Sequence, residues 1–177
     1  MKILTIHSDF LEFEPKQKAI KSAEEWTQGI RRIEECLVIF TAVEKSDEKN
    51  PGQAVENLLK EIKDVAAQVK ADKIVLYPYA HLSKDLALPD VALNIMKSAE
   101  QRLQEEKYKV VRAPFGWYKA FTIKCKGHPL SELSREMTIE AAEKKELSYD
   151  YKELLRTISK TRLDTRDLKD NDHRILG

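Results

Sequence analysis

The sequence has little of what marks a metal-binding or disulfide-stabilised protein. It contains two cysteines among 177 residues, Cys36 and Cys125, and they are clustered neither with each other nor with histidines. A structural zinc site needs about four close ligands. The pattern therefore excludes such a site and favours reduced, buried thiols in a cytoplasmic protein.

Long apolar runs are also missing. The longest, over residues 36–40, is far too short to cross a bilayer. The apolar amino terminus is followed by Asp9, Glu12 and Glu14, so the hydrophobic region of a signal peptide does not develop. A first β-strand is the better interpretation of this segment.

The bulk composition is that of a folded domain. Hydrophobic residues make up 42% and charged residues 34% of the chain, with a net charge of +1. These values exclude a disordered or membrane-spanning protein, and the length suits one domain plus an appendage. A net charge near zero says nothing about local charged patches.

The hydrophobic pattern predicts strands at 2–7 and 36–43 and then a helix, which Asn50 caps and Pro51 begins. Its apolar residues recur at helical spacing. They are Val55, Leu58, Leu59, Ile62, Val65, Ala66 and Val69.

Further strands are predicted at 74–77, 108–112 and 118–125, and a second amphipathic helix begins near Pro89. Strands interleaved with two such helices favour an α/β fold, a β-sheet sandwich with two packed amphipathic helices. The character changes after residue 137. We expect 1–137 to be one domain and 138–177 a charged helical linker that leads into another domain.

Residues 107–131 contain no Asp or Glu but several cations and aromatics. Cations that meet phosphates and aromatic rings that stack on bases are typical of a nucleic-acid surface. Strand alternation also produces this pattern, with solvated lysines on one face and core aromatics on the other. Composition alone leaves both interpretations open.

Two loops carry candidate functional groups. His81 follows a buried strand, and binding sites of α/β sheets lie where such strands end. Glu132 is the first acid after the basic stretch, and near Lys119 and Tyr118 it would orient a substrate hydroxyl or amine. Alternatively, His81 is structural and Glu132 pairs with a surface lysine.

Four segments together resemble one family, the editing domain of archaeal threonyl-tRNA synthetases. They are IHSD at 6–9, YPYAHLS at 77–83, APFGWYKAF at 113–121 and CKGHPLSELS at 125–134. The resemblance covers roughly residues 1–137, and its specificity lies in the ordered combination.

The resemblance implies a D-aminoacyl-tRNA deacylase-like fold, a homodimer, and hydrolysis of Ser-tRNA(Thr) without metal or nucleotide cofactor. It places His81, Tyr118, Lys119 and Glu132 around the ester. It also implies a seryl-adenosine pocket lined by Val43, Pro78, Ala80 and Phe115. Trp117 departs from the family, in which tyrosine is common there.

The tail, DHRILG at 172–177, is similar to the beginning of the class II aminoacylation domain. This similarity implies a fragment that lacks the aminoacylation and anticodon-binding domains of its parent synthetase. Two other functions stay open, a free-standing D-aminoacyl-tRNA deacylase and a non-catalytic tRNA-binding or dimerisation module.

Overall fold

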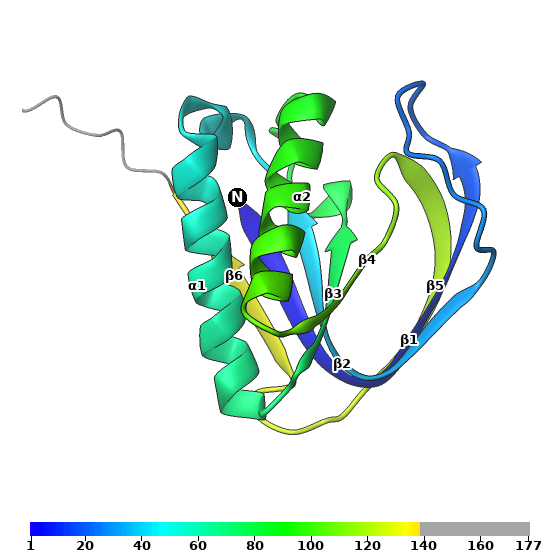
Figure 1. Cartoon of the computed structure of the whole chain (residues 1–177), viewed down its shortest axis with the longest axis vertical. Coiled ribbons are helices and arrows are strands. Elements are labelled where there is room, and N and C mark those ends of the chain that lie inside the picture. Colours follow the sequence, from blue (N-terminus) through cyan, green and yellow to red (C-terminus); the bar gives the residue numbers. More distant parts are fainter. Residues whose placement is uncertain (139–177) are drawn as a thin grey trace, which may run out of the picture. The chain divides into compact units, whose positions relative to one another are not determined.

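Residues 1–138 are described by the computed structural model, in which one mixed sheet is covered by two helices (Figure 1). The strand order is β4-β3-β2-β1-β5, and β6 also pairs with β1. The strands are β1 (Lys2–Lys18), β2 (Arg31–Ala42), β3 (Lys73–Pro78), β4 (Lys109–Arg112), β5 (Trp117–Cys125) and β6 (Glu132–Glu136). The predicted charged helix and the class II-like tail lie outside the described residues.

The first helix, α1 (Pro51–Val69), begins where the sequence predicts. The Asn50 side chain accepts a hydrogen bond from the Gln53 amide, and Pro51 occupies the first turn, where no intrahelical donor is needed. The second helix, α2 (Pro89–Glu105), likewise begins at a proline. Both predicted helices are confirmed, because each has an apolar face that is buried.

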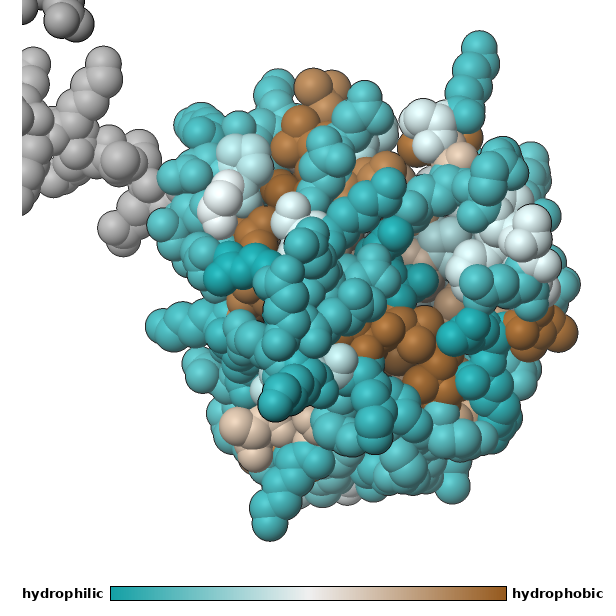
Figure 2. All heavy atoms as spheres, in the orientation of Figure 1, coloured by the Kyte–Doolittle hydropathy of each residue, from teal (hydrophilic) through white to brown (hydrophobic). Residues whose placement is uncertain are grey.

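Both helices pack against the same face of the sheet. Their apolar residues form one core cluster with side chains of β1, β2 and β3, including Ile3, Leu37 and Ile74. A second cluster occupies the opposite sheet face and contains Phe13, Phe40 and Tyr77. On the side viewed in Figure 1, the surface is mostly hydrophilic with small apolar patches (Figure 2).

The first strand is much longer than predicted. The sequence pattern places a strand at 2–7, whereas β1 extends to Lys18 and begins a long curled ribbon with β2 and β5 (Figure 1). One edge of β1 pairs with β2, and the other pairs first with β6 and then with β5. Hydrogen bonds on both edges keep this polar segment extended.

The amino group of Met1 is held by two acidic residues of the segment that connects β2 to α1. The Met1 ammonium lies 2.9 Å from Glu44 Oε2 and 3.1 Å from Asp47 Oδ2, and it donates to the Met137 carbonyl at 2.8 Å. Asp47 belongs to the short 3₁₀ helix η1 (Lys45–Lys49) and is buried. This cluster ties β1 and the end of β6 to the segment that precedes α1.

Candidate functional site

The main cavity lies where β2 and β3 end. These two strands are parallel, so their carboxyl ends meet at one edge of the sheet, where α/β folds commonly bind ligands. The cavity has a volume of about 610 Å³. Further walls come from the end of β1 and the segment after it, the segment that follows β3, the start of α2, the turn between β4 and β5, and the start of β5.

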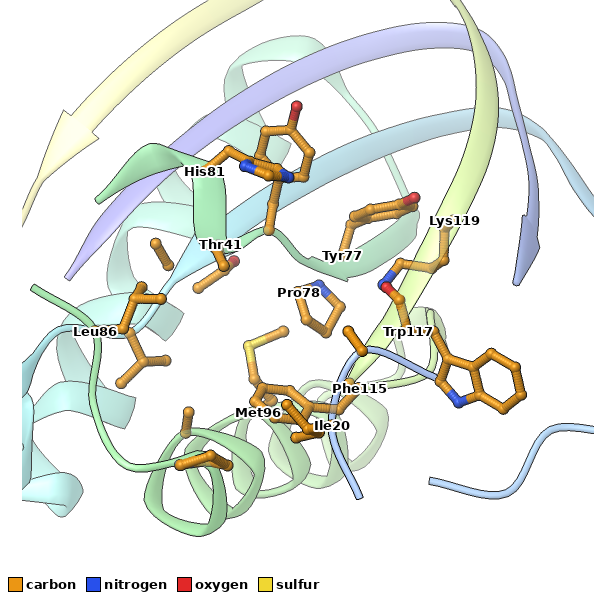
Figure 3. A pocket seen from close by; sticks show the side chains of 18 of the residues that line it. Ile20, Thr41, Tyr77, Pro78, His81, Leu86, Met96, Phe115, Trp117 and Lys119 are labelled. Carbon is orange, nitrogen blue, oxygen red and sulfur yellow. The ribbon is translucent and has the colours of Figure 1, made fainter. Parts of the chain in front are cut away.

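Seven of the eight residues that the sequence singled out line this cavity. They are Val43, Pro78, Ala80, His81, Phe115, Tyr118 and Lys119. They come from three separate parts of the chain, and the sheet topology brings them together. Figure 3 shows Lys119 beside Tyr77 and Trp117 along one wall, with His81 on another side and Pro78 between them.

Lys119 is the charged group most closely integrated into the cavity wall. Its Nζ donates to the carbonyl oxygens of Pro114 at 3.2 Å and Trp117 at 3.0 Å, and it lies 5.0 Å from the centre of the Tyr77 ring. Burial lowers the pKa of Lys119 to about 8, and the negative charge of Glu24 opposes this shift. The ammonium is therefore held in place by neutral acceptors and an aromatic face.

His81 and Tyr118 lie at the exposed rim. His81 belongs to the 3₁₀ helix η2 (Ala80–Leu82), and its ring centre is 5.2 Å from that of Tyr79. Tyr118 is 59% exposed. Both side chains are therefore free to contact a ligand that enters the cavity from solvent.

Within this chain, Glu132 does not lie beside Lys119 and Tyr118 as expected. Glu132 begins β6 opposite Ile6, and its Oε1 accepts a hydrogen bond from the Cys125 thiol at 3.4 Å. Cys125 ends β5, whereas Tyr118 and Lys119 lie at the start of that strand, roughly 20 Å away at about 3.3 Å per residue. Glu132 does not line the cavity that holds Lys119.

The basic stretch at 107–131 is largely neutralised by acids from elsewhere in the chain. Lys109 pairs with Asp72 at 2.8 Å, and Lys124 and Lys126 both pair with Asp9. Arg112 is bound by Glu24 and Glu100. The stretch is therefore not a continuous row of free cations for phosphates, and the interpretation as a pair of ordinary strands accounts for most of it.

Sequence reasoning missed much of the cavity wall. Lys16, Ala19 and Ile20 line it because β1 continues far beyond residue 7. Met96 lines it from α2, where its helical spacing indicated only a core position. Tyr77 lines it from a strand whose pattern predicted burial alone. Of these residues, only Tyr77 belongs to one of the four segments that resemble the family, and the others lie outside all four.

Clusters of metal-ligating side chains and membrane-spanning helices are both absent from the described part of the chain. Residues 1–138 contain no cluster of three or more His, Cys, Asp or Glu side chains arranged to hold a metal ion. Over the same residues, no helix has both the length and the apolar character needed to cross a membrane.

Comparison with known proteins identifies close relatives. Residues 1–137 match the family model described as the archaea-specific editing domain of threonyl-tRNA synthetase. The chain is 56% identical over 146 residues to threonine–tRNA ligase of Methanopyrus kandleri, a match that covers 82% of this chain and 23% of the relative. It is 53% identical over 148 residues to the Thermococcus kodakarensis enzyme, covering 82% and 24%. The chain thus spans about a quarter of the relatives' length.

A solved structure supports the fold. The protein named c-Myc DNA Unwinding Element Binding Protein superposes with a TM-score of 0.54 at 11% identity, covering 78% of this chain and all of that one. At this identity the match concerns architecture alone. The predicted fold class, an α/β domain with two amphipathic helices packed on a sheet, is confirmed.

Proposed function

The chain belongs to the archaea-specific editing domains of threonyl-tRNA synthetase, and from this membership we propose that it hydrolyses serine from mischarged Ser-tRNA(Thr). The observation that carries the proposal is the convergence of seven predicted site residues on one cavity. Its volume of about 610 Å³ leaves room for an aminoacyl group with part of the terminal nucleoside.

The chemistry explains why such a second site is needed. Serine lacks one methyl group of threonine, and a missing methylene changes binding by only about 1–3 kcal/mol. A synthetic site that relies on this difference charges serine too often for accurate translation. A separate hydrolytic site removes the error.

The proposed mechanism is ester hydrolysis by a positioned water. The Lys119 ammonium, fixed by two carbonyls, holds that water or stabilises the negative charge that develops on the ester oxygen. The terminal ribose 2′-hydroxyl takes part in proton transfer. His81 orients the seryl group and ribose from the rim, and backbone groups near Ala80 fix the handedness of the substrate.

Neither cysteine of the chain is well placed to attack the substrate and form a covalent intermediate. Cys36 is fully buried and its burial raises the thiol pKa to about 11, while Cys125 lies at the far end of β5. This supports a substrate-assisted reaction that uses no cysteine nucleophile. A role for Glu132 at the ester stays a prediction without a supporting contact in this chain.

The proposed partners are the 3′ acceptor end of tRNA(Thr), the other domains of a parent synthetase and a second copy of the chain. An apolar sheet face supports the dimer. Its residues line a shallow depression on the sheet and are Leu4, Ile6, Phe40, Tyr79, Phe121 and Ile123. Phe121 is 40% exposed there, and covering such a surface from water favours association.

The decisive experiment follows amino-acid release from Ser-tRNA(Thr), Thr-tRNA(Thr) and a D-aminoacyl-tRNA. We expect rapid loss of serine and little loss of threonine, with serine release reduced at least tenfold in Lys119→Met. Lys124→Met is the matched control, because Lys124 lies on the same strand but pairs with Asp9 outside the cavity. Equal, negligible loss of serine and threonine contradicts the proposal. Preferential loss of the D-amino acid favours the deacylase alternative, and tRNA binding without any release favours a binding module.

A further inference from the structure

The 19–30 segment between β1 and β2 is interlocked with the 113–117 turn between β4 and β5. The Ala19 amide donates to the Gly116 carbonyl at 2.7 Å, and the Glu24 amide donates to the Phe115 carbonyl at 3.2 Å. Gly116 has a φ of +81°, and a Cβ atom at this position would lie 2.8 Å from Ile20 Cγ1. The two segments are therefore in direct backbone contact, with no room for a side chain between them.

Glu24 is the centre of this contact. Its Oε2 accepts a hydrogen bond from the Phe115 amide at 2.9 Å, and its backbone carbonyl accepts one from the Trp117 indole at 2.8 Å. Its Oε1 accepts from Arg112 Nη2, also at 2.9 Å. Burial by itself would raise the pKa of Glu24. The hydrogen bonds from Arg112 and Phe115 have the larger combined effect, so the pKa of Glu24 lies below its usual range. Glu24 is therefore a charged, multiply bonded group at neutral pH.

The turn that Glu24 holds is the one that holds Lys119. The Lys119 ammonium donates to the carbonyls of Pro114 and Trp117, which flank the Phe115 amide bound by Glu24. A shift of this turn would move both acceptors of the ammonium. A displacement of about 1 Å at a reacting group can cost on the order of a hundredfold in rate.

We propose that Glu24 is a positioning residue for deacylation: by fixing the 113–117 turn, it fixes where the Lys119 ammonium faces the cavity. This inference rests on the proposed function for its effect on rate. The placement of Lys119 itself does not depend on which substrate the cavity takes.

Electrostatics add a second link between the two residues. Glu24 is the negative charge that opposes the burial-driven fall in the pKa of Lys119. Arg112 and Lys97 also face Glu24, and Glu100 faces Arg112, so removal of the Glu24 charge leaves these two cations with less compensation. The loss of Glu24 therefore lowers the pKa of Lys119 further.

The test compares Glu24→Gln with Glu100→Gln in the full chain. Glu100 accepts a hydrogen bond from Arg112 Nε at 2.7 Å, whereas Glu24 accepts bonds from two groups of the turn itself, the Phe115 amide and the Trp117 indole. We expect Glu24→Gln to lower kcat for serine release by about tenfold or more, and Glu100→Gln to change it by less than about twofold. The pKa of Lys119, followed by the NMR shift of its labelled Cε, falls in Glu24→Gln and stays near the wild-type value in Glu100→Gln.

The kcat for serine release and the titration of Lys119 together distinguish failure of the positioning role from failure of the proposed function. If Glu24→Gln only lowers the melting temperature, while kcat and the titration of Lys119 match the wild type, the positioning role is overturned. If the wild-type chain releases no serine, the proposed function fails, but the Lys119 titration still decides whether Glu24 acts on Lys119.

Glu24→Asp covers the case in which Glu24→Gln does not fold. The shorter side chain keeps the negative charge but withdraws it from the Phe115 amide. We therefore expect a lower kcat together with a wild-type pKa of Lys119. A wild-type kcat in folded Glu24→Asp overturns the proposal.

Discussion

The Lys119 ammonium lies 5.0 Å from the centre of the Tyr77 ring, on the wall of the cavity that gathers the predicted site residues. Tyr77 is 2% exposed, and its burial raises the pKa of its hydroxyl, so the ring is neutral and presents its π-electrons to the cation. The cavity thus contains a cation that is stabilised mainly by uncharged groups. The stability and activity of the domain follow from this arrangement in ways that can be measured.

Serine release is expected to depend on pH through Lys119. Burial lowers its pKa to about 8, so the ammonium that would stabilise negative charge is lost as pH rises through that value. After subtraction of spontaneous hydrolysis, we expect kcat to fall above about pH 8. Lys124 is exposed, so the pH–rate profile of Lys124→Met should match that of the wild type. A rate that keeps rising through pH 8–10 contradicts a role for the charged form.

Replacement of Lys119 by methionine should not destabilise the fold at neutral pH. The folded-state pKa of about 8 lies below the ordinary lysine value of 10.5, so the unfolded chain binds the proton more tightly than the folded chain does. Burial of the charged lysine therefore lowers the free energy of unfolding, and this penalty has its full size below pH 8. It disappears as pH rises from about 8 to 10.5. We expect Lys119→Met to gain up to about 3 kcal/mol at pH 7, less the lost hydrogen bonds. Urea unfolding at pH 7 and pH 10 measures this, and a gain that is larger at pH 10 contradicts it.

Gly116→Ala should be strongly destabilising because the position lacks both space and a suitable backbone conformation. The added Cβ would lie 2.8 Å from Ile20 Cγ1 and 2.9 Å from Ala23 Cα at a φ of +81°. We expect a loss of about 2–4 kcal/mol in the free energy of unfolding. Gly127→Ala is the control, since Gly127 has a φ of +69° but an added Cβ would meet nothing within 4 Å, so only about 1 kcal/mol of backbone strain is expected there. Equal losses in the two variants would show that the contact with Ile20 and Ala23 is unimportant.

Asp47→Asn should cost about 3 kcal/mol because it leaves the Met1 ammonium with one fewer buried carboxylate. Asp47 is 1% exposed, lies 3.1 Å from that ammonium and accepts a hydrogen bond from the Glu44 amide at 2.7 Å. Asp72→Asn removes an exposed ion pair with Lys109 and should change stability by less than about 0.5 kcal/mol. Chemical denaturation of both variants tests the contrast, which fails if the two losses are alike.

Phe121→Lys should weaken the proposed dimer at least tenfold, because it places a charge in the apolar sheet face. Ile30→Lys is the control, since Ile30 is also a large exposed apolar residue, at 59%, but lies outside that face. Sedimentation velocity across a range of concentrations gives both dissociation constants. A monomeric wild-type chain, or equal weakening by the two variants, contradicts this assignment of the interface.

Local chemistry explains which elements could be predicted. The helices follow from apolar spacing and from Asn50, Pro51 and Pro89, all of which act within a few residues along the chain. The end of β1 and the whole of β6 could not be predicted, because polar residues dominate them and pairing with distant strands holds them extended. Their hydrogen bonds are invisible to a local pattern.

The same division applies to the site. The family and the two helices could be predicted from the sequence by itself, as could seven residues of the cavity wall, because these depend on short motifs and on apolar periodicity. Only the tertiary structure decided that Glu132 lies beside Cys125 at the far end of β5, and that Glu24, 88 residues from Arg112, holds the turn to which Lys119 donates. Strand register and loop packing set such distances, and both are sums of many non-local contacts.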